Sequence, residues 1–144
     1  MSKNIPVIKH PGAVLIVPFL SRDKVVMLRQ FRAVIGKYLY ELPAGTLEKN
    51  ESFLSSARRE LREETGYSVK RLTKIGYIYP VPGYSTEKII IYKADGLTAV
   101  GRRPESDEII ETGEVSRQRL RRFFKEGRLR DAKTICAFAL CGWI

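Results

Sequence analysis

The 144-residue sequence has few side chains that could form disulfide bonds or bind structural zinc: two cysteines and one histidine. A structural zinc site needs four Cys or His ligands, so it is excluded. Cys136 and Cys141 lie five positions apart in an apolar C-terminal segment. Helical geometry would point them to different sides, so we expect no disulfide. We interpret them as two buried thiols of a cytoplasmic protein.

Long hydrophobic runs are also missing. The longest, residues 13–20, is far too short to span a membrane and contains Pro18. The first twelve residues lack the apolar core of a signal peptide. We therefore expect no membrane association. There is no internal repeat, low-complexity tract or linker, and the length suits one domain spanning residues 1–144.

Acidic residues are outnumbered, with 26 Lys and Arg against 16 Asp and Glu, which gives a net charge of +10. The excess is concentrated in residues 116–133, which carry eight bases and two acids. Such a segment could bind nucleic acid or form a solvated helix face. Leu120, Phe123 and Phe124 interleave the bases at helical spacing, which favours a core-facing stripe over a stacking platform. We expect no nucleic-acid partner.

Apolar periodicity and turn residues predict six strands, near residues 13–18, 24–29, 38–42, 74–79, 88–92 and 109–115. They also predict three helices, near residues 52–65, 116–125 and 131–141. Strands outnumber helices and do not alternate with them regularly. This pattern indicates an α/β (α+β) fold with a mixed sheet between helices.

The most informative segment is GTLEKNESFLSSARRELREETGY, residues 45–67. On a helix at about 100° per residue, Glu60 and Glu64 fall within about 20° of Phe53, beside an apolar stripe formed by Ala57, Leu61 and Leu54. A solvated helix would place its carboxylates on the outer side. Like charges four residues apart repel, and carboxylates near a core need a partner. A hard divalent cation, Mg²⁺ or Mn²⁺, supplies one.

This segment resembles the Nudix box at each defining position: Gly45, Glu51, Arg59, Glu60, Leu61, Glu63, Glu64 and Gly66. The last position of the motif is usually a branched aliphatic residue and is Tyr67 here. An amphipathic surface helix would not explain the spacing. The resemblance implies a Nudix-type α/β/α sandwich with a mixed β-sheet. It also implies hydrolysis of a nucleoside diphosphate linked to another moiety.

Three flanking segments resemble the ADP-ribose pyrophosphatase branch: residues 28–32 with 41–45, residues 80–87, and residues 127–134. Pro82 lies fifteen positions past Tyr67, where that branch has its marker proline. The resemblance implies Mg²⁺-dependent conversion of ADP-ribose to AMP and ribose 5-phosphate. Another nucleoside diphosphate sugar or a dinucleotide remains an alternative substrate. A catalytically silent module that binds nucleotide or RNA is an alternative of another class, although the intact glutamates of the box argue against it.

The resemblance also implies roles for single residues. Glu60, Glu64, Glu63 and the backbone carbonyl of Ala44 are the expected metal ligands. Arg59 takes part in catalysis or, like Glu51, is structural, forming an ion pair that orients the carboxylates.

On the substrate side, Arg32 is expected to contact the diphosphate, and Glu87 is expected to position the Arg32 side chain. Glu41 is expected to make a further metal or substrate contact, and Pro82 to belong to the substrate site. We favour Glu108 as the general base over Glu105 and Glu111, with Glu63 as the candidate if these loop acids fail.

Members of this branch usually carry an additional N-terminal strand segment that is exchanged across a dimer and helps to hold the adenine. About ten residues precede the core here. We still expect a homodimer, built on sheet and loop surfaces. The mode of adenine recognition and the dimer geometry of this branch are therefore the features least expected to apply to this chain.

Overall fold

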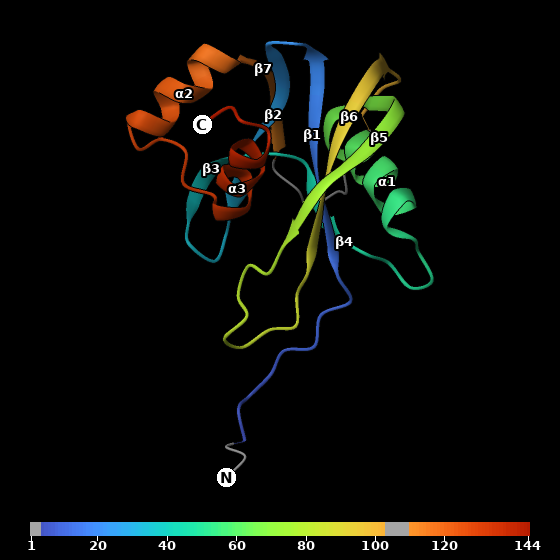
Figure 1. Cartoon of the computed structure of the whole chain (residues 1–144), viewed down its shortest axis with the longest axis vertical. Helices are drawn as coiled ribbons and strands as arrows, with labels where there is room; N and C mark the ends of the chain where they lie inside the picture. Colours follow the sequence, from blue (N-terminus) through green and yellow to red (C-terminus); the bar gives the residue numbers. More distant parts are fainter. Residues whose placement is uncertain (1–3, 103–109) are drawn as a thin grey trace.

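The computed structural model describes residues 4–102 and 110–144. Within these ranges the elements are β1 (Ala13–Ser21), β2 (Lys24–Arg32), β3 (Lys37–Glu41), β4 (Ala44–Thr46), α1 (Phe53–Thr65), β5 (Tyr67–Ile78), β6 (Ile89–Ala99), β7 (Ile110–Ser116), α2 (Arg117–Lys125) and α3 (Ala132–Leu140). Figure 1 shows the strands at the centre, with α1 on one side and α2 and α3 on the other.

The strands form a branched mixed sheet. Its main path runs β3-β2-β1-β6-β5, while β4 pairs with β1 and β7 pairs with β2. The β1–β6 pairing is parallel, with Ala13 opposite Ile89, and the other pairings are antiparallel. The expected mixed sheet between helices is therefore confirmed.

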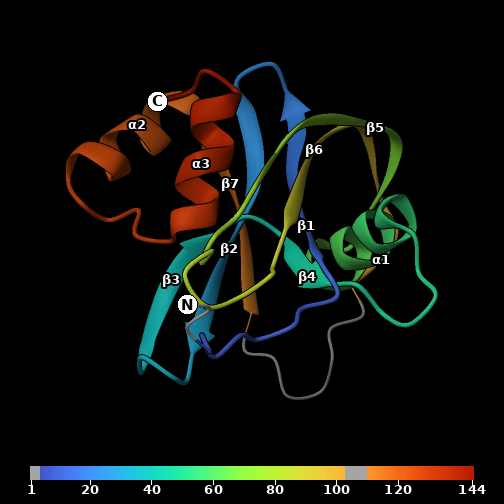
Figure 2. The ribbon, with the colours of Figure 1, turned by 60° about the horizontal axis from the view of Figure 1, so that its bottom comes forward.

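Both faces of the central strands are apolar, because side chains alternate along a strand. On β1, Val14 and Ile16 join the core under α1, whereas Leu15 and Val17 join the larger core under α3. Ala57 and Leu61 bring the apolar stripe of α1 onto the first face. Figure 2 shows the two helical layers on opposite sides of the sheet. This arrangement holds α1 against β1 and β4.

Three local expectations need correction. Leu54, predicted to form part of the apolar stripe, is half exposed. The strand expected near residue 74 begins at Tyr67, directly after α1. Only Val69 of β5 is buried, so the first half of this strand lacks the alternating apolar pattern that would reveal it. The cysteines are both free, as expected, but neither is fully buried: Cys136 is exposed and Cys141 is half-buried.

No helix in the described part of the chain combines the length and apolar character needed to cross a membrane.

Candidate active site

The carboxylates of the box lie on α1, and both ends of this helix are capped. The Ser52 hydroxyl accepts a hydrogen bond from the Ser55 N–H at 3.1 Å. Gly66 ends the helix at φ 77°, in the left-handed region that glycine adopts without strain. The fixed register places Glu60 and Glu64 inward, with 8% and 3% of their surface exposed. The prediction that these two carboxylates lie beside the apolar stripe is confirmed.

Arg59 is the centre of this carboxylate cluster. Its guanidinium donates to Glu51 through Nε at 2.8 Å and Nη2 at 3.0 Å. Nη1 donates to Glu60 at 2.8 Å and to Glu63 at 3.1 Å, and it lies 3.7 Å from Glu48. The hydrogen bond from Arg59 lowers the pKa of Glu51 from 4.5 to about 2. Arg59 thus binds the helical carboxylates to the loop that precedes the helix.

Gly45 provides a cradle for Glu60. A Cβ atom on Gly45 would lie 2.0 Å from both Cδ and Oε1 of Glu60, closer than real Cβ contacts allow. The neighbouring Ala44 N–H donates to Oε2 of Glu64 at 3.0 Å. The backbone of strand β4 therefore packs directly against the carboxylates of helix α1. This close approach explains why position 45 requires a glycine.

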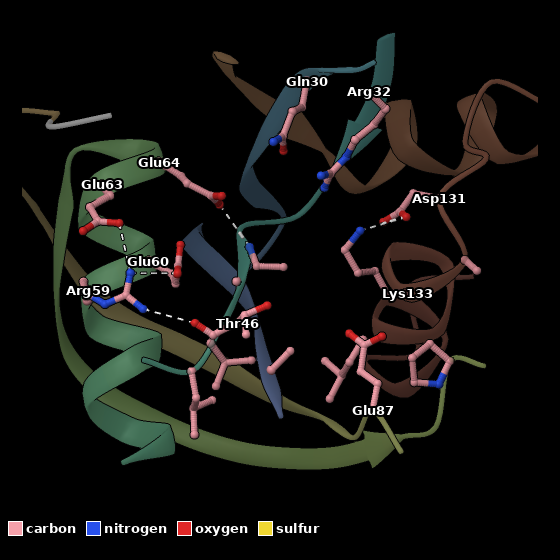
Figure 3. A pocket seen from close by; sticks show the side chains of 18 of the residues that line it. Gln30, Arg32, Thr46, Arg59, Glu60, Glu63, Glu64, Glu87, Asp131 and Lys133 are labelled. Carbon is pink, nitrogen blue, oxygen red and sulfur yellow. Dashed lines mark hydrogen bonds and ion pairs between the residues drawn. The ribbon is translucent and has the colours of Figure 1, made fainter. Parts of the chain in front are cut away.

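A second charged cluster lies on the opposite wall of the cavity (Figure 3). Glu41, only 1% exposed, accepts from Arg32 Nε at 2.7 Å and from Arg32 Nη2 at 2.6 Å. The same carboxylate accepts from Lys133 Nζ at 2.7 Å. Burial alone would raise the pKa of Glu41, but the Arg32 hydrogen bonds and the Lys133 charge outweigh burial and lower it. Glu41 is therefore an anion shared by two cations.

The loop between β5 and β6 closes another side of the cavity through Pro80, Val81 and Glu87. The N-terminal segment holds this loop in place: Ile8 N–H donates to the Tyr84 carbonyl at 2.7 Å. His10 lies 3.8 Å from the Glu87 carboxylate.

The cavity is open to solvent on one side and measures about 760 Å³. Carboxylates line one wall and cations the other, an arrangement suited to an anionic ligand of nucleotide size that is bound with a divalent cation.

Most residues that were predicted for the site line this cavity: Arg32, Ala44, Arg59, Glu60, Glu63, Glu64 and Glu87. Glu41 lies behind Arg32, and it is Glu41, rather than the expected Glu87, that holds the Arg32 guanidinium. Pro82 is exposed on the loop whose neighbours Pro80 and Val81 line the cavity.

The remaining candidates are the three acids proposed as the general base. Glu108 and Glu105 lie outside the described residues. Glu111 is exposed on β7, and its carboxylate lies 3.3 Å from Nη1 of Arg29.

The sequence interpretation gave no role to Lys133, Asp131 and Gln30, which also line the cavity. Lys133 and Asp131 belong to the segment 127–134 that resembled the family's C-terminal signature, so a signal was present. The segment alone did not indicate that Lys133 would meet Glu41, 92 residues earlier in the sequence.

The donor set on α1 fits a divalent metal in its chemistry. Three carboxylates within five residues supply hard oxygen donors, and Gly45 leaves room for one of them against the backbone. No group of three such side chains already has the geometry of a metal site in the part of the chain that the structure describes. Arg59 draws Glu60 and Glu63 toward itself, so metal binding requires these carboxylates to turn from the guanidinium.

Comparison with known proteins agrees with this geometry. The ADP-ribose pyrophosphatase of Bacillus subtilis (strain 168) is 38% identical over 133 residues, covering 91% of this chain and 72% of the relative. A methanol dehydrogenase activator of Bacillus methanolicus is 36% identical over 135 residues, with the same coverage. A crystal structure of an ADP compounds hydrolase superposes with a TM-score of 0.81 over 90% of this chain and 70% of its own, at 23% identity, which supports the fold alone. The NUDIX domain model matches residues 9–138, and the chain therefore belongs to the Nudix family.

Proposed function

We propose that this Nudix hydrolase cleaves the pyrophosphate bond of ADP-ribose and releases AMP and ribose 5-phosphate. One observation carries the proposal: the α1 carboxylates face the Arg32–Lys133 wall across a cavity of about 760 Å³. A diphosphate needs both a divalent cation and fixed donors for its oxygens. The similarity to the B. subtilis ADP-ribose pyrophosphatase over 91% of the chain supports the choice of substrate.

Nudix hydrolases generally use divalent metals. We propose that Glu60, Glu63, Glu64 and the Ala44 carbonyl hold Mg²⁺, with Mn²⁺ as a second possibility. When bound, the metal neutralises charge on the diphosphate and polarises the phosphorus under attack. Arg59 then keeps its two hydrogen bonds to Glu51, which hold the guanidinium beside the carboxylates that bind the metal.

The remaining steps belong to the chain itself. Arg32, held by Glu41, donates to non-bridging diphosphate oxygens in the bidentate manner typical of arginine. Glu87 lines the same cavity and contacts the substrate beside it. We propose that Glu108 accepts the proton of the attacking water. As the water oxygen bonds to one phosphorus, the bond from that phosphorus to the bridging oxygen breaks. The other phosphate, with the bridging oxygen, leaves as part of the second product.

A panel of nucleoside diphosphate derivatives tests the substrate. Turnover is measured for ADP-ribose, other nucleoside diphosphate sugars, dinucleotides and a nucleoside triphosphate, with Mg²⁺, with Mn²⁺ and with chelator, and the products are identified. The proposal requires AMP release from ADP-ribose that chelator abolishes. Rapid turnover of a nucleoside triphosphate, with no turnover of ADP-ribose, would refute the assignment of ADP-ribose as the substrate. The absence of turnover of any compound, with nucleotide binding retained, would favour a silent binding module.

We also propose a homodimer, a cytoplasmic location and a single domain across residues 1–144. The two free thiols suit a reducing compartment. Exposed apolar residues at the tip of the β2–β3 hairpin, such as fully exposed Val34, offer surface for a second copy. Sedimentation at assay concentrations tests the dimer, and a fully active monomer would exclude it.

A further inference from the structure

Lys133 occupies a position that local helix energetics disfavour. It is the second residue of α3, beside the Asp131 N-cap, where the helix presents its positive end. Its side chain is 19% exposed, so the ammonium has lost much of its hydration. A lysine stabilises a helix near its C-terminal end, where it can interact with the last carbonyl groups, and Lys133 lies at the opposite end of α3. The position therefore indicates a task outside the helix.

The ammonium is held rigidly by two carboxylates. Nζ donates to Glu41 at 2.7 Å and to Asp131 at 2.9 Å. An ammonium has three donors, so these bonds leave one for a ligand, and Lys133 lines the cavity. Figure 3 shows Lys133 and Arg32 on the same wall, opposite the α1 carboxylates.

The two carboxylates of this cluster already use most of their hydrogen-bond acceptor sites. Glu41 accepts three hydrogen bonds, two from Arg32 and one from Lys133. Asp131 accepts from the Thr134 N–H at 3.3 Å and from the Thr134 hydroxyl at 2.6 Å, besides Lys133. The wall therefore offers donors to a ligand and little acceptor capacity, a combination that selects an anion.

Glu41 also sets the spacing of these donors. Oε1 of Glu41 accepts from Arg32 Nη2 at 2.6 Å and from Lys133 Nζ at 2.7 Å. The two nitrogens consequently lie within roughly 5 Å of each other, a span that the oxygens of one phosphoryl group can bridge.

We propose that Lys133 is a substrate-binding residue that grips, together with Arg32, the phosphoryl group of the diphosphate that lies farther from the α1 carboxylates. Glu41 is the shared positioning residue of this pair. The inference deepens the proposed function and rests on it for the identity of the whole substrate. It requires only that the ligand contain a diphosphate.

The test measures binding without turnover. Isothermal titration in chelator records the affinity of inorganic pyrophosphate and of ADP-ribose for the wild type, Lys133→Met and Lys133→Arg. Lys125→Met is the matched control, because it makes the same chemical change on an exposed residue of α2 outside the cavity. Thermal unfolding of each variant sets a titration temperature at which all four proteins are folded.

Loss of one charge-assisted hydrogen bond to a phosphoryl oxygen should weaken both ligands on the order of 10- to 100-fold in Lys133→Met. Lys133→Arg should recover most of the affinity, and Lys125→Met should match the wild type. In Mg²⁺, Lys133→Met should raise the KM for ADP-ribose more than it lowers kcat, because Lys133 holds substrate and does not move a proton.

Unchanged pyrophosphate affinity in folded Lys133→Met overturns the inference, as does an arginine variant no better than the methionine variant. A lower melting temperature with unaltered affinity also overturns it, since Lys133 would then only satisfy Glu41. If pyrophosphate binding depends on Lys133 while ADP-ribose is not hydrolysed, the proposed substrate fails and this inference stands.

Discussion

Replacing Gly45 by alanine probes the proposed metal site without changing any charge. The glycine lies on β4, and a Cβ atom there would come 2.0 Å from Cδ and Oε1 of Glu60. Ordinary contacts begin near 3.4 Å, so the Glu60 carboxylate must retreat by about 1.4 Å. Gly45 does not have the positive φ that would strain an alanine, so the strand itself tolerates the change.

The expected effect is on metal use and catalysis. Displacing a reacting or ligating group by about 1 Å costs on the order of 10² in rate, so kcat in saturating Mg²⁺ should fall by about that factor. The Mg²⁺ concentration for half-maximal rate should also rise, because one ligand is pushed from its cradle. The fold should persist, because the methyl group meets the end of a side chain and leaves the surrounding backbone in place.

The assay is steady-state hydrolysis of ADP-ribose across a Mg²⁺ titration, with circular dichroism as the check on folding. Gly113→Ala is the control, since a Cβ at Gly113 on β7 would meet nothing within 4 Å. If folded Gly45→Ala keeps the kcat and the metal dependence of the control, the space at Gly45 does not position Glu60 as a metal ligand.

Three further predictions test other parts of the site. Glu64→Gln keeps the side-chain shape and should lower the rate on the order of 10² or more with the fold intact; near wild-type turnover at low Mg²⁺ would remove it from the ligand set. Because the pKa of Glu51 is lowered to about 2 by Arg59, the stabilisation from this ion pair is complete above about pH 4.5 and is lost as the pH falls toward 2. Urea unfolding should show Glu51→Gln less stable than wild type at neutral pH, with the gap closing in that acidic window; a constant gap contradicts the assignment. Glu108→Gln should lower kcat about 10² to 10⁴-fold with KM nearly unchanged, and Glu105→Gln should lower kcat much less. A larger loss of kcat in Glu105→Gln would show that Glu108 is not the general base.

The sequence was sufficient to predict the helix that carries the box. Helical periodicity placed Glu60 and Glu64 beside Ala57 and Leu61, and both glutamates are buried there. Cap residues indicated the helix boundaries to within one residue, from Phe53 to Thr65. These features depend on neighbours within a few turns of chain, and local pattern determines them.

The features that were missed depend on tertiary packing. The first half of β5 pairs with β6 through its backbone but has few buried side chains, so its own sequence carries no apolar pattern that would reveal the strand. The exposure of Cys136 likewise follows from the face of α3 that packs on the sheet. That face carries Ala137 and Phe138, and a run of mostly apolar residues does not identify which side is covered.

The assignment of Glu41 shows why spacing alone could not complete the site. From the sequence, an acid two positions before Pro43 suggested a metal or substrate contact, and Glu87 was expected to hold Arg32. In the fold, Glu41 ends β3 opposite Leu28 of β2, and it lies beside the first turn of α3. A buried carboxylate at that junction must be neutralised, and Arg32 and Lys133 do so from two different elements. Burial at a junction of three elements thus makes Glu41 the carboxylate shared by two cavity-facing cations, and only tertiary structure could reveal that it has both partners.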